Sequence, residues 1–176
     1  MSLRHGLLGL LADGPASGYD LLRRFDNSLV NVWPASQSQL SPELNKLARD
    51  GRVEVVEEGG RHRKTYGITE AGRAELRHWL VEVPPVRAPR SEALLRVFFL
   101  RTLDPDEARG YLRKEAAAYR GWLDHLEQLR DELPWSDSGF DRFGRIALES
   151  GIRTAAALIE WAEWAEHETE HRPAGP

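Results

Sequence analysis

Polar side chains gather on one face of a helix predicted over residues 36–49. Leu40, Leu44 and Leu47 recur there at helical spacing, so the polar residues between them are expected to face outward. Amide groups can bond the edges of DNA bases through paired hydrogen bonds, whereas serine, lysine and arginine can bond bases or phosphates. A solvated polar face, which any surface helix has, is the other interpretation. The outward set consists of Ser36, Gln37, Ser38, Gln39, Ser41, Asn45, Lys46 and Arg49.

Basic residues gather in a second place, a turn at residues 61–64 with the sequence Arg-His-Arg-Lys. Residues 53–58 before it and 65–69 after it carry β-branched side chains, and two glycines precede the turn. We therefore predict two short strands joined as a β-hairpin. Cations at a hairpin tip suit the phosphate backbone of a nucleic acid. The other interpretation is a solvated turn whose cations offset the charge of Glu57 and Glu58.

The elements expected around these two clusters are helix, helix, helix, strand, strand and helix. A leucine stripe marks the first helix, and residues 13–15, Asp-Gly-Pro, end it because proline cannot continue a helix. Ser17 is the predicted N-cap of the second helix and Thr69 that of the fourth, while Pro42 falls within the first turn of the third. Three helices followed by a hairpin is the order of a winged helix-turn-helix, whose third helix enters the DNA major groove.

Three prolines near residues 84–89 separate this pattern from a purely helical second half, since each proline restricts its neighbours. We predict a winged helix-turn-helix DNA-binding domain over residues 1–85, a proline-rich linker over 86–90 and an α-helical dimerisation domain over 91–170. The expected fold class is therefore mainly α with a small β-hairpin.

Long helices in the second half favour a homodimer. Helices are predicted over 91–101, 104–133 and 137–167, and the first of them is apolar nearly all round, so it should be buried or sandwiched. Two helices of about 30 residues on so small a body expose apolar flanks unless a partner covers them. The candidate interface residues are Leu94, Phe98, Tyr119, Trp122, Leu126, Leu158 and Trp161.

Enzymatic and metal chemistry find little support. The chain has no cysteine, which excludes disulfides, thiolate zinc sites and a thiol nucleophile. No Gly-x-Ser-x-Gly elbow, Walker loop or Rossmann glycine pattern occurs, so we expect no enzyme and no cofactor. His167 and His171 stand four residues apart, a spacing that can hold a metal. They lie in a polar tail, however, and ordinary solvated histidines are the preferred interpretation.

The charge and hydropathy of the chain limit the classes of partner that it is expected to bind. The net charge is −4, but residues 1–85 are neutral overall, which leaves the first half as the better candidate to meet an anion. No apolar run approaches the roughly 20 residues that span a bilayer, so we expect no membrane partner and a cytoplasmic location.

Several motifs of the first half occur in a characteristic order. They are Leu-Gly-Leu-Leu at 8–11, Gly-Pro-Ala-Ser-Gly-Tyr-Asp-Leu at 14–21, Trp-Pro-Ala-Ser at 33–36, Gln-Leu-Ser-Pro-Glu-Leu at 39–44, and Arg63-Lys64, Tyr66, Ile68-Thr69 and Gly72. In this order they resemble the PadR family of bacterial transcriptional regulators. Residues 90–170 resemble, through vaguer motifs, the helical dimerisation region of one PadR subgroup. PadR-like recognition helices commonly carry tyrosine where this chain has Ser41.

The resemblance implies a homodimer whose two recognition helices contact a pseudo-palindromic operator at half-sites about one helical turn apart. Such proteins are mostly repressors, released from DNA when a ligand or another signal shifts the dimer geometry. Base contacts are expected from Gln37, Gln39, Ser41 and Asn45, and backbone contacts from Ser36, Lys46, Arg61, Arg63, Lys64 and Tyr66. Ser17 and Tyr19, in the motif at 14–21, complete the predicted DNA-binding set.

Tryptophans in the second half suggest a ligand site. Trp122, Trp161 and Trp164 are candidates to bind a flat aromatic effector, since aromatic cavities suit such molecules. Plain core and interface packing is the other interpretation. For the whole chain, the alternative function is a winged-helix adaptor that binds a protein and no operator.

Overall fold

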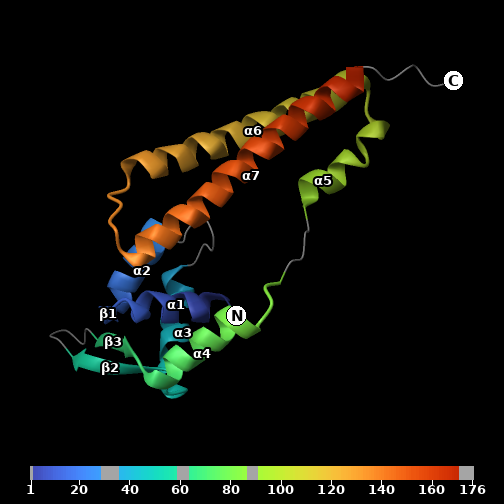
Figure 1. Ribbon diagram of the computed structural model, residues 1–176. Coiled ribbons are helices and arrows are strands. Elements are labelled where there is room, and N and C mark those ends of the chain that lie inside the picture. The colour runs from blue at the N-terminus through green and yellow to red at the C-terminus, as the bar shows by residue number, and fades with distance from the viewer. Residues whose placement is uncertain (1, 29–35, 59–63, 87–90, 171–176) are drawn as a thin grey trace. The chain divides into compact units, whose positions relative to one another are not determined.

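The computed structural model describes residues 2–28, 36–58, 64–86 and 91–170. The chain divides into two compact units, Met1–Arg87 and Ala88–Pro176. The first unit combines helices with a small antiparallel sheet (Figure 1). Its described elements are α1 (Ser2–Ala12), β1 (Ala16–Ser17), α2 (Gly18–Ser28), α3 (Gln37–Arg49), β2 (Val53–Glu58), β3 (Lys64–Ile68) and α4 (Glu70–Glu82). The winged helix-turn-helix order is confirmed.

The sheet has three strands in the order β1-β3-β2, so the predicted two-stranded hairpin was incomplete. Ala16 pairs with Tyr66 and Ser17 with Thr65, which makes β3 the central strand. On the other side, Val55 lies opposite Tyr66 and Glu58 opposite Lys64. A two-residue strand shows no alternation in the sequence, and only its distant partner defines it.

Local capping residues set the helix boundaries as predicted. The Ser17 hydroxyl accepts a hydrogen bond from the Asp20 N–H at 3.2 Å, and the Thr69 hydroxyl accepts one from the Gly72 N–H at 3.1 Å. Pro42 is the sixth residue of α3, which begins at Gln37, so it lies in the second turn and not in the first as predicted. Proline has no N–H to donate, so α3 forgoes one backbone hydrogen bond in its second turn.

The core of the first unit fixes which face of α3 points outward. Leu40, Leu44 and Leu47 are at most 3% exposed and pack with leucines of α1 and with Phe25 of α2. The core also includes Leu7, Leu8, Leu10, Leu11, Ala16, Leu21 and Val53. The predicted helix periodicity is therefore confirmed, and the polar residues of α3 between these leucines face away from the core.

A cluster of charged groups ties α1, α4 and the end of α3 together. The Arg4 guanidinium bonds the Glu75 carboxylate through Nε (2.5 Å) and Nη2 (3.1 Å), and its Nη1 bonds Asp50 at 2.9 Å. Arg52 Nε lies 2.8 Å from Glu75 Oε2, the oxygen that also accepts from Arg4 Nη2. The hydrogen bonds from Arg4, helped by the charges of Arg4 and Arg52, lower the pKa of Glu75 below its ordinary value.

Glu75→Gln is expected to destabilise the protein by about 1–3 kcal/mol at neutral pH, because it removes the negative charge that accepts hydrogen bonds from Arg4 and pairs with Arg52. Since folding lowers the pKa of Glu75, its contribution is complete above the ordinary carboxyl pKa of about 4.3 and disappears as pH falls through the lower folded value. Urea unfolding at several pH values checks this. Glu82→Gln on the same helix is the control, since Glu82 is 63% exposed and faces His78 at 3.5 Å. An equal loss in both variants would contradict the assignment.

The described part of the second unit is helical. It contains α5 (Glu92–Val97), the short 3-10 helix η2 (Leu100–Thr102), α6 (Pro105–Glu132) and α7 (Gly139–Glu170), and α6 and α7 lie side by side (Figure 1). Asp104 caps α6 as predicted, accepting a hydrogen bond from the Glu107 N–H at 2.8 Å. None of the described helices combines the length and apolar character that a bilayer span requires.

The helix predicted over 91–101 is shorter than expected, and its apolar side chains are not buried within the single chain. The helix ends at Val97, and Leu95, Phe98 and Phe99 are 58%, 76% and 56% exposed. Helix α5 itself carries the exposed Glu92–Arg96 ion pair, and the single chain leaves the apolar side chains beside it and just after it uncovered.

The predicted interface residues divide into two groups. Leu94 and Phe98 are exposed, while Tyr119, Trp122, Leu158 and Trp161 are half-buried. Leu126 is only 2% exposed, and its side chain packs against Gly151 of α7. Leu126 therefore belongs to the core between α6 and α7, and its assignment to a dimer interface was wrong.

Candidate nucleic-acid interface

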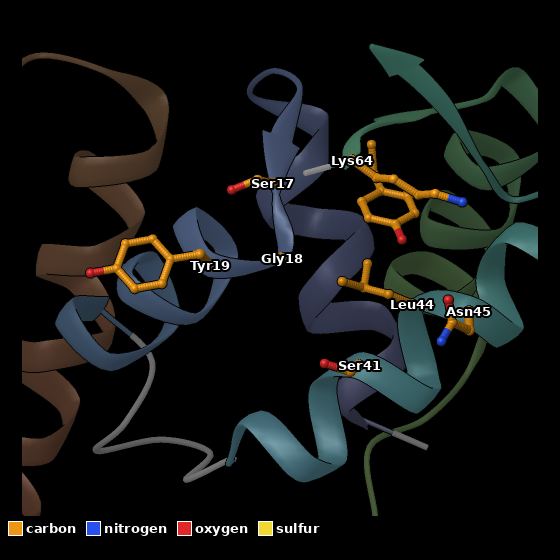
Figure 2. Close-up of a pocket in the computed structure, with 8 residues that line it drawn as sticks. Ser17, Gly18, Tyr19, Ser41, Leu44, Asn45 and Lys64 are labelled. Atoms are coloured by element: carbon orange, nitrogen blue, oxygen red, sulfur yellow. The ribbon is translucent and has the colours of Figure 1, made fainter. Parts of the chain in front are cut away.

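Six residues of the predicted DNA-binding set line one open pocket of the first unit, of about 370 Å³. The beginning of α2, the outward face of α3 and strand β3 each contribute to it (Figure 2). Sequence reasoning did not single out two lining residues, Gly18 and Leu44, because neither carries a polar side chain. The full lining is Ser17, Gly18, Tyr19, Ser41, Leu44, Asn45, Lys64 and Tyr66.

Helix α3 presents Ser41 and Asn45 to the pocket from consecutive turns. Both side chains are exposed, as is that of Lys46. Leu44, which lies between them in sequence, is 3% exposed and joins the core. The buried leucines therefore hold Ser41 and Asn45 in fixed positions, which a hydrogen-bonding surface requires.

The start of α3 uses two predicted contact residues for its own stability. The Ser36 backbone N–H donates to the Gln39 side-chain oxygen at 3.0 Å. The Ser36 and Ser38 hydroxyls lie 2.8 Å apart, within hydrogen-bond distance. The arrangement of Ser36 and Gln39 is a capping box, which satisfies a backbone donor at the helix N-terminus. Ser36 and Gln39 therefore orient α3, whatever further contacts they make.

Ser17 and Tyr19 differ sharply in accessibility. Ser17 is 3% exposed, and its hydroxyl donates to the Asp20 carboxylate at 2.6 Å while capping α2. Capping and burial leave Ser17 little surface for a ligand, and its predicted DNA contact stays a prediction. Tyr19 is 66% exposed, and Figure 2 shows its ring extending away from Asn45 and Lys64. Arg61, Arg63 and the side chain of Gln37 lie outside the described residues.

Strand β3 contributes Lys64 and Tyr66 to the same pocket as Ser41 and Asn45. Tyr66 is half-buried and packs on the core, held between Ala16 of β1 and Val55 of β2. Lys64 is half-exposed, and its Nζ lies 3.6 Å from Glu58 Oε1. An unbroken strand register would place Glu57 opposite Lys64, but a register shift between Val55 and Glu57 moves Glu58 into that position.

Comparison with known proteins places both halves of the chain. The model of the PadR-like family of transcriptional regulators matches residues 7–78, and that of the virulence activator alpha C-terminal region matches residues 89–170. A probable transcriptional regulator of Mycobacterium tuberculosis is 37% identical over 183 residues, covering 93% of this chain and 95% of the relative. The negative transcriptional regulator PadR of Bacillus subtilis is 28% identical over 170 residues, covering 92% and 93%.

Solved structures agree over nearly the whole length. Bacillus subtilis PadR in complex with operator DNA superposes with a TM-score of 0.84 at 26% identity, covering 96% of this chain and 99% of that one. The same protein in complex with p-coumaric acid gives 0.86 at 28% identity, with 97% and 100% covered. The Vibrio cholerae virulence activator AphA gives 0.78 at 26% identity, with 96% and 98% covered. The sequence motifs, the fold and these relatives together show that the chain belongs to the PadR-like family of transcriptional regulators.

Proposed function

We propose that the chain is a sequence-specific DNA-binding repressor that acts as a homodimer on a pseudo-palindromic operator. The observation that carries this proposal is the pocket face, where Ser41 and Asn45 of α3 meet Lys64 and Tyr66 of β3. Amides and hydroxyls on a helix suit base edges, and a cation on the wing suits phosphates. The operator complex of Bacillus subtilis PadR supports this function over that of a protein-binding adaptor.

The two units would divide the work between them. Residues 1–85 would bind DNA, residues 86–90 would link, and residues 91–170 would dimerise. The exposed apolar side chains in and just after α5 support the last assignment, since Phe98, the C-cap of α5, is 76% exposed in the single chain. Two copies would place two α3 helices at half-sites about one helical turn apart. A regulator of this kind must reach the chromosome, so the proposal places it in the cytoplasm.

Asn45→Ala and Lys46→Ala separate base contacts from phosphate contacts. Asn45→Ala is expected to weaken operator binding by about 1–3 kcal/mol and to relax specificity at one base pair per half-site. Lys46→Ala should weaken binding to all duplexes alike and reduce the salt slope by about one per subunit. Titrations of DNA from upstream of its own gene, against single-base variants and at several salt concentrations, measure both. If Asn45→Ala weakens all sequences equally, the proposed base contact is wrong.

We further propose that a flat aromatic molecule releases the repressor from DNA. Trp161 packs beside Leu100, Leu112 and Ala165, while Trp164, three residues on, is 59% exposed. Trp122 is half-buried on the neighbouring helix. Bacillus subtilis PadR has been solved with p-coumaric acid, a ligand of this class. Tryptophan fluorescence followed together with operator release, across a panel of aromatic acids, tests this proposal.

A further inference from the structure

The pocket lined by residues of α2, α3 and β3 has the side chains that a binding site for a single anion requires. Its polar lining includes the Lys64 ammonium, the Ser41 and Tyr66 hydroxyls and the Asn45 amide (Figure 2). None of these lining residues is acidic. With a volume of about 370 Å³, the pocket can hold a phosphate together with bridging waters. These side chains come from two separate elements, so folding brings the donors together.

Two of the donors differ in how firmly they are held. The Tyr66 ring packs on the core at the centre of the sheet, so its position is fixed before any ligand arrives. The Lys64 side chain is 49% exposed and is free to turn between partners. A fixed hydroxyl beside a mobile cation lets the hydroxyl set the position of an anion while the ammonium supplies the charge.

The Glu58 carboxylate forms an ion pair with the Lys64 ammonium in the structure. The two groups lie 3.6 Å apart, and the two residues are paired across β2 and β3. Both side chains are about half or more exposed, so this ion pair is weak and easily exchanged. An incoming phosphate must compete with this carboxylate for the same cation.

We propose that Glu58 competes within the chain for Lys64 against one backbone phosphate of the duplex, which this pocket seats through the Lys64 and Tyr66 contacts that the sequence predicts. The proposal rests on the proposed DNA-binding function and specifies one contact within it. The carboxylate of Asp20 lies in the first turn of α2, where it offsets the positive end of that helix. The seat is therefore built from the side chains of α3 and β3 rather than from the helix N-terminus.

Operator duplexes with one neutral methylphosphonate at a time provide the test. With the wild-type protein, one position per half-site should lose affinity about 5- to 20-fold, since a charged contact disappears there. Tyr66→Phe and Lys64→Gln should each weaken binding to unmodified DNA by a similar factor and become insensitive to methylphosphonate at that same position. Lys64→Gln should also reduce the salt slope by about one per subunit. Tyr66→Phe keeps the packed ring, so the fold should be preserved, which circular dichroism checks.

Glu58→Gln should act in the opposite direction, binding duplex DNA about 2- to 5-fold more tightly at low salt because it frees Lys64. Glu57→Gln is the matched control: it removes the same charge but lies opposite Thr65, so it should gain less. If Tyr66→Phe and Lys64→Gln leave the methylphosphonate profile unchanged while the wild type binds its operator, the phosphate seat is wrong and the proposed function stands. If the wild type binds no DNA, both are wrong.

Discussion

Gly72→Ala is expected to destabilise the protein by about 2–4 kcal/mol, although alanine stabilises most helix positions that glycine occupies. Gly72 is buried in the first turn of α4. A Cβ there would lie 2.1 Å from the Arg52 carbonyl oxygen and 2.9 Å from Ile68 Cγ1. The Arg52 carbonyl is backbone and already accepts a hydrogen bond from the Thr69 N–H at 3.1 Å. It therefore cannot retreat without weakening the connection into α4.

The helix cap of α4 adds to the expected loss. The Gly72 N–H donates to the Thr69 hydroxyl at 3.1 Å, and that hydroxyl donates in turn to the Gly51 carbonyl at 2.8 Å. Moving Gly72 away from Arg52 disturbs both bonds, and a lost N-cap costs about 1 kcal/mol. The two effects act on the same few residues, so they are not independent.

Gly9→Ala is the matched control for this prediction. Gly9 lies within α1, and a Cβ there would meet nothing within 4 Å. The substitution should stabilise the protein by about 0.4–1 kcal/mol, because alanine restricts the unfolded chain more than glycine does. Thermal or urea unfolding of the two variants gives the comparison. A stabilising Gly72→Ala would contradict the close approach of α4 to Arg52.

Phe98→Glu is expected to convert the protein to monomers and to reduce operator affinity about 100-fold or more, because simultaneous binding at two half-sites is lost. Phe98 is 76% exposed and stands beside Leu94, Leu95 and Phe99, which are also exposed. A carboxylate placed in an apolar contact is costly because it loses its hydration. Sedimentation velocity and operator titration measure the two effects.

Phe98→Leu controls for the loss of the ring, since it keeps an apolar side chain at the same place. It should remain dimeric and bind the operator with affinity close to that of the wild type. A Phe98→Glu variant that still sediments as a dimer would remove α5 from the proposed interface. Circular dichroism of both variants shows whether α6 and α7 remain folded.

Elements with local signals were predictable from the sequence. Leucine spacing identified α3 and its inward face, and the N-caps Ser17 and Thr69 fixed two helix starts, because residues within one turn of each other determine both features. The same locality explains why Gly51 ends α3: its φ of +66° lies in the left-handed region that glycine adopts easily.

Features that depend on distant partners were not predictable. Strand β1 exists because Ala16 meets Tyr66, and the burial of Ser17 follows from that pairing. Arg4 finds Glu75 only when α1 and α4 pack together, and nothing in either helix alone indicates this ion pair. The candidate site divides in the same way: the outward residues of α3 were predicted, whereas the placing of Tyr66 and Lys64 in the same pocket follows from the folded sheet.

We propose that two copies of this chain present their two α3 helices to one DNA duplex. Hydroxyl-radical footprinting on the DNA upstream of its own gene, with the number of chains per duplex measured on the same complex, tests it most directly. If a dimer binds, we expect two symmetric protected patches about one helical turn apart, with two chains bound. A single protected patch with one chain bound would contradict the proposed dimer. So would the absence of protection at every concentration tested of a protein that is folded and sediments normally.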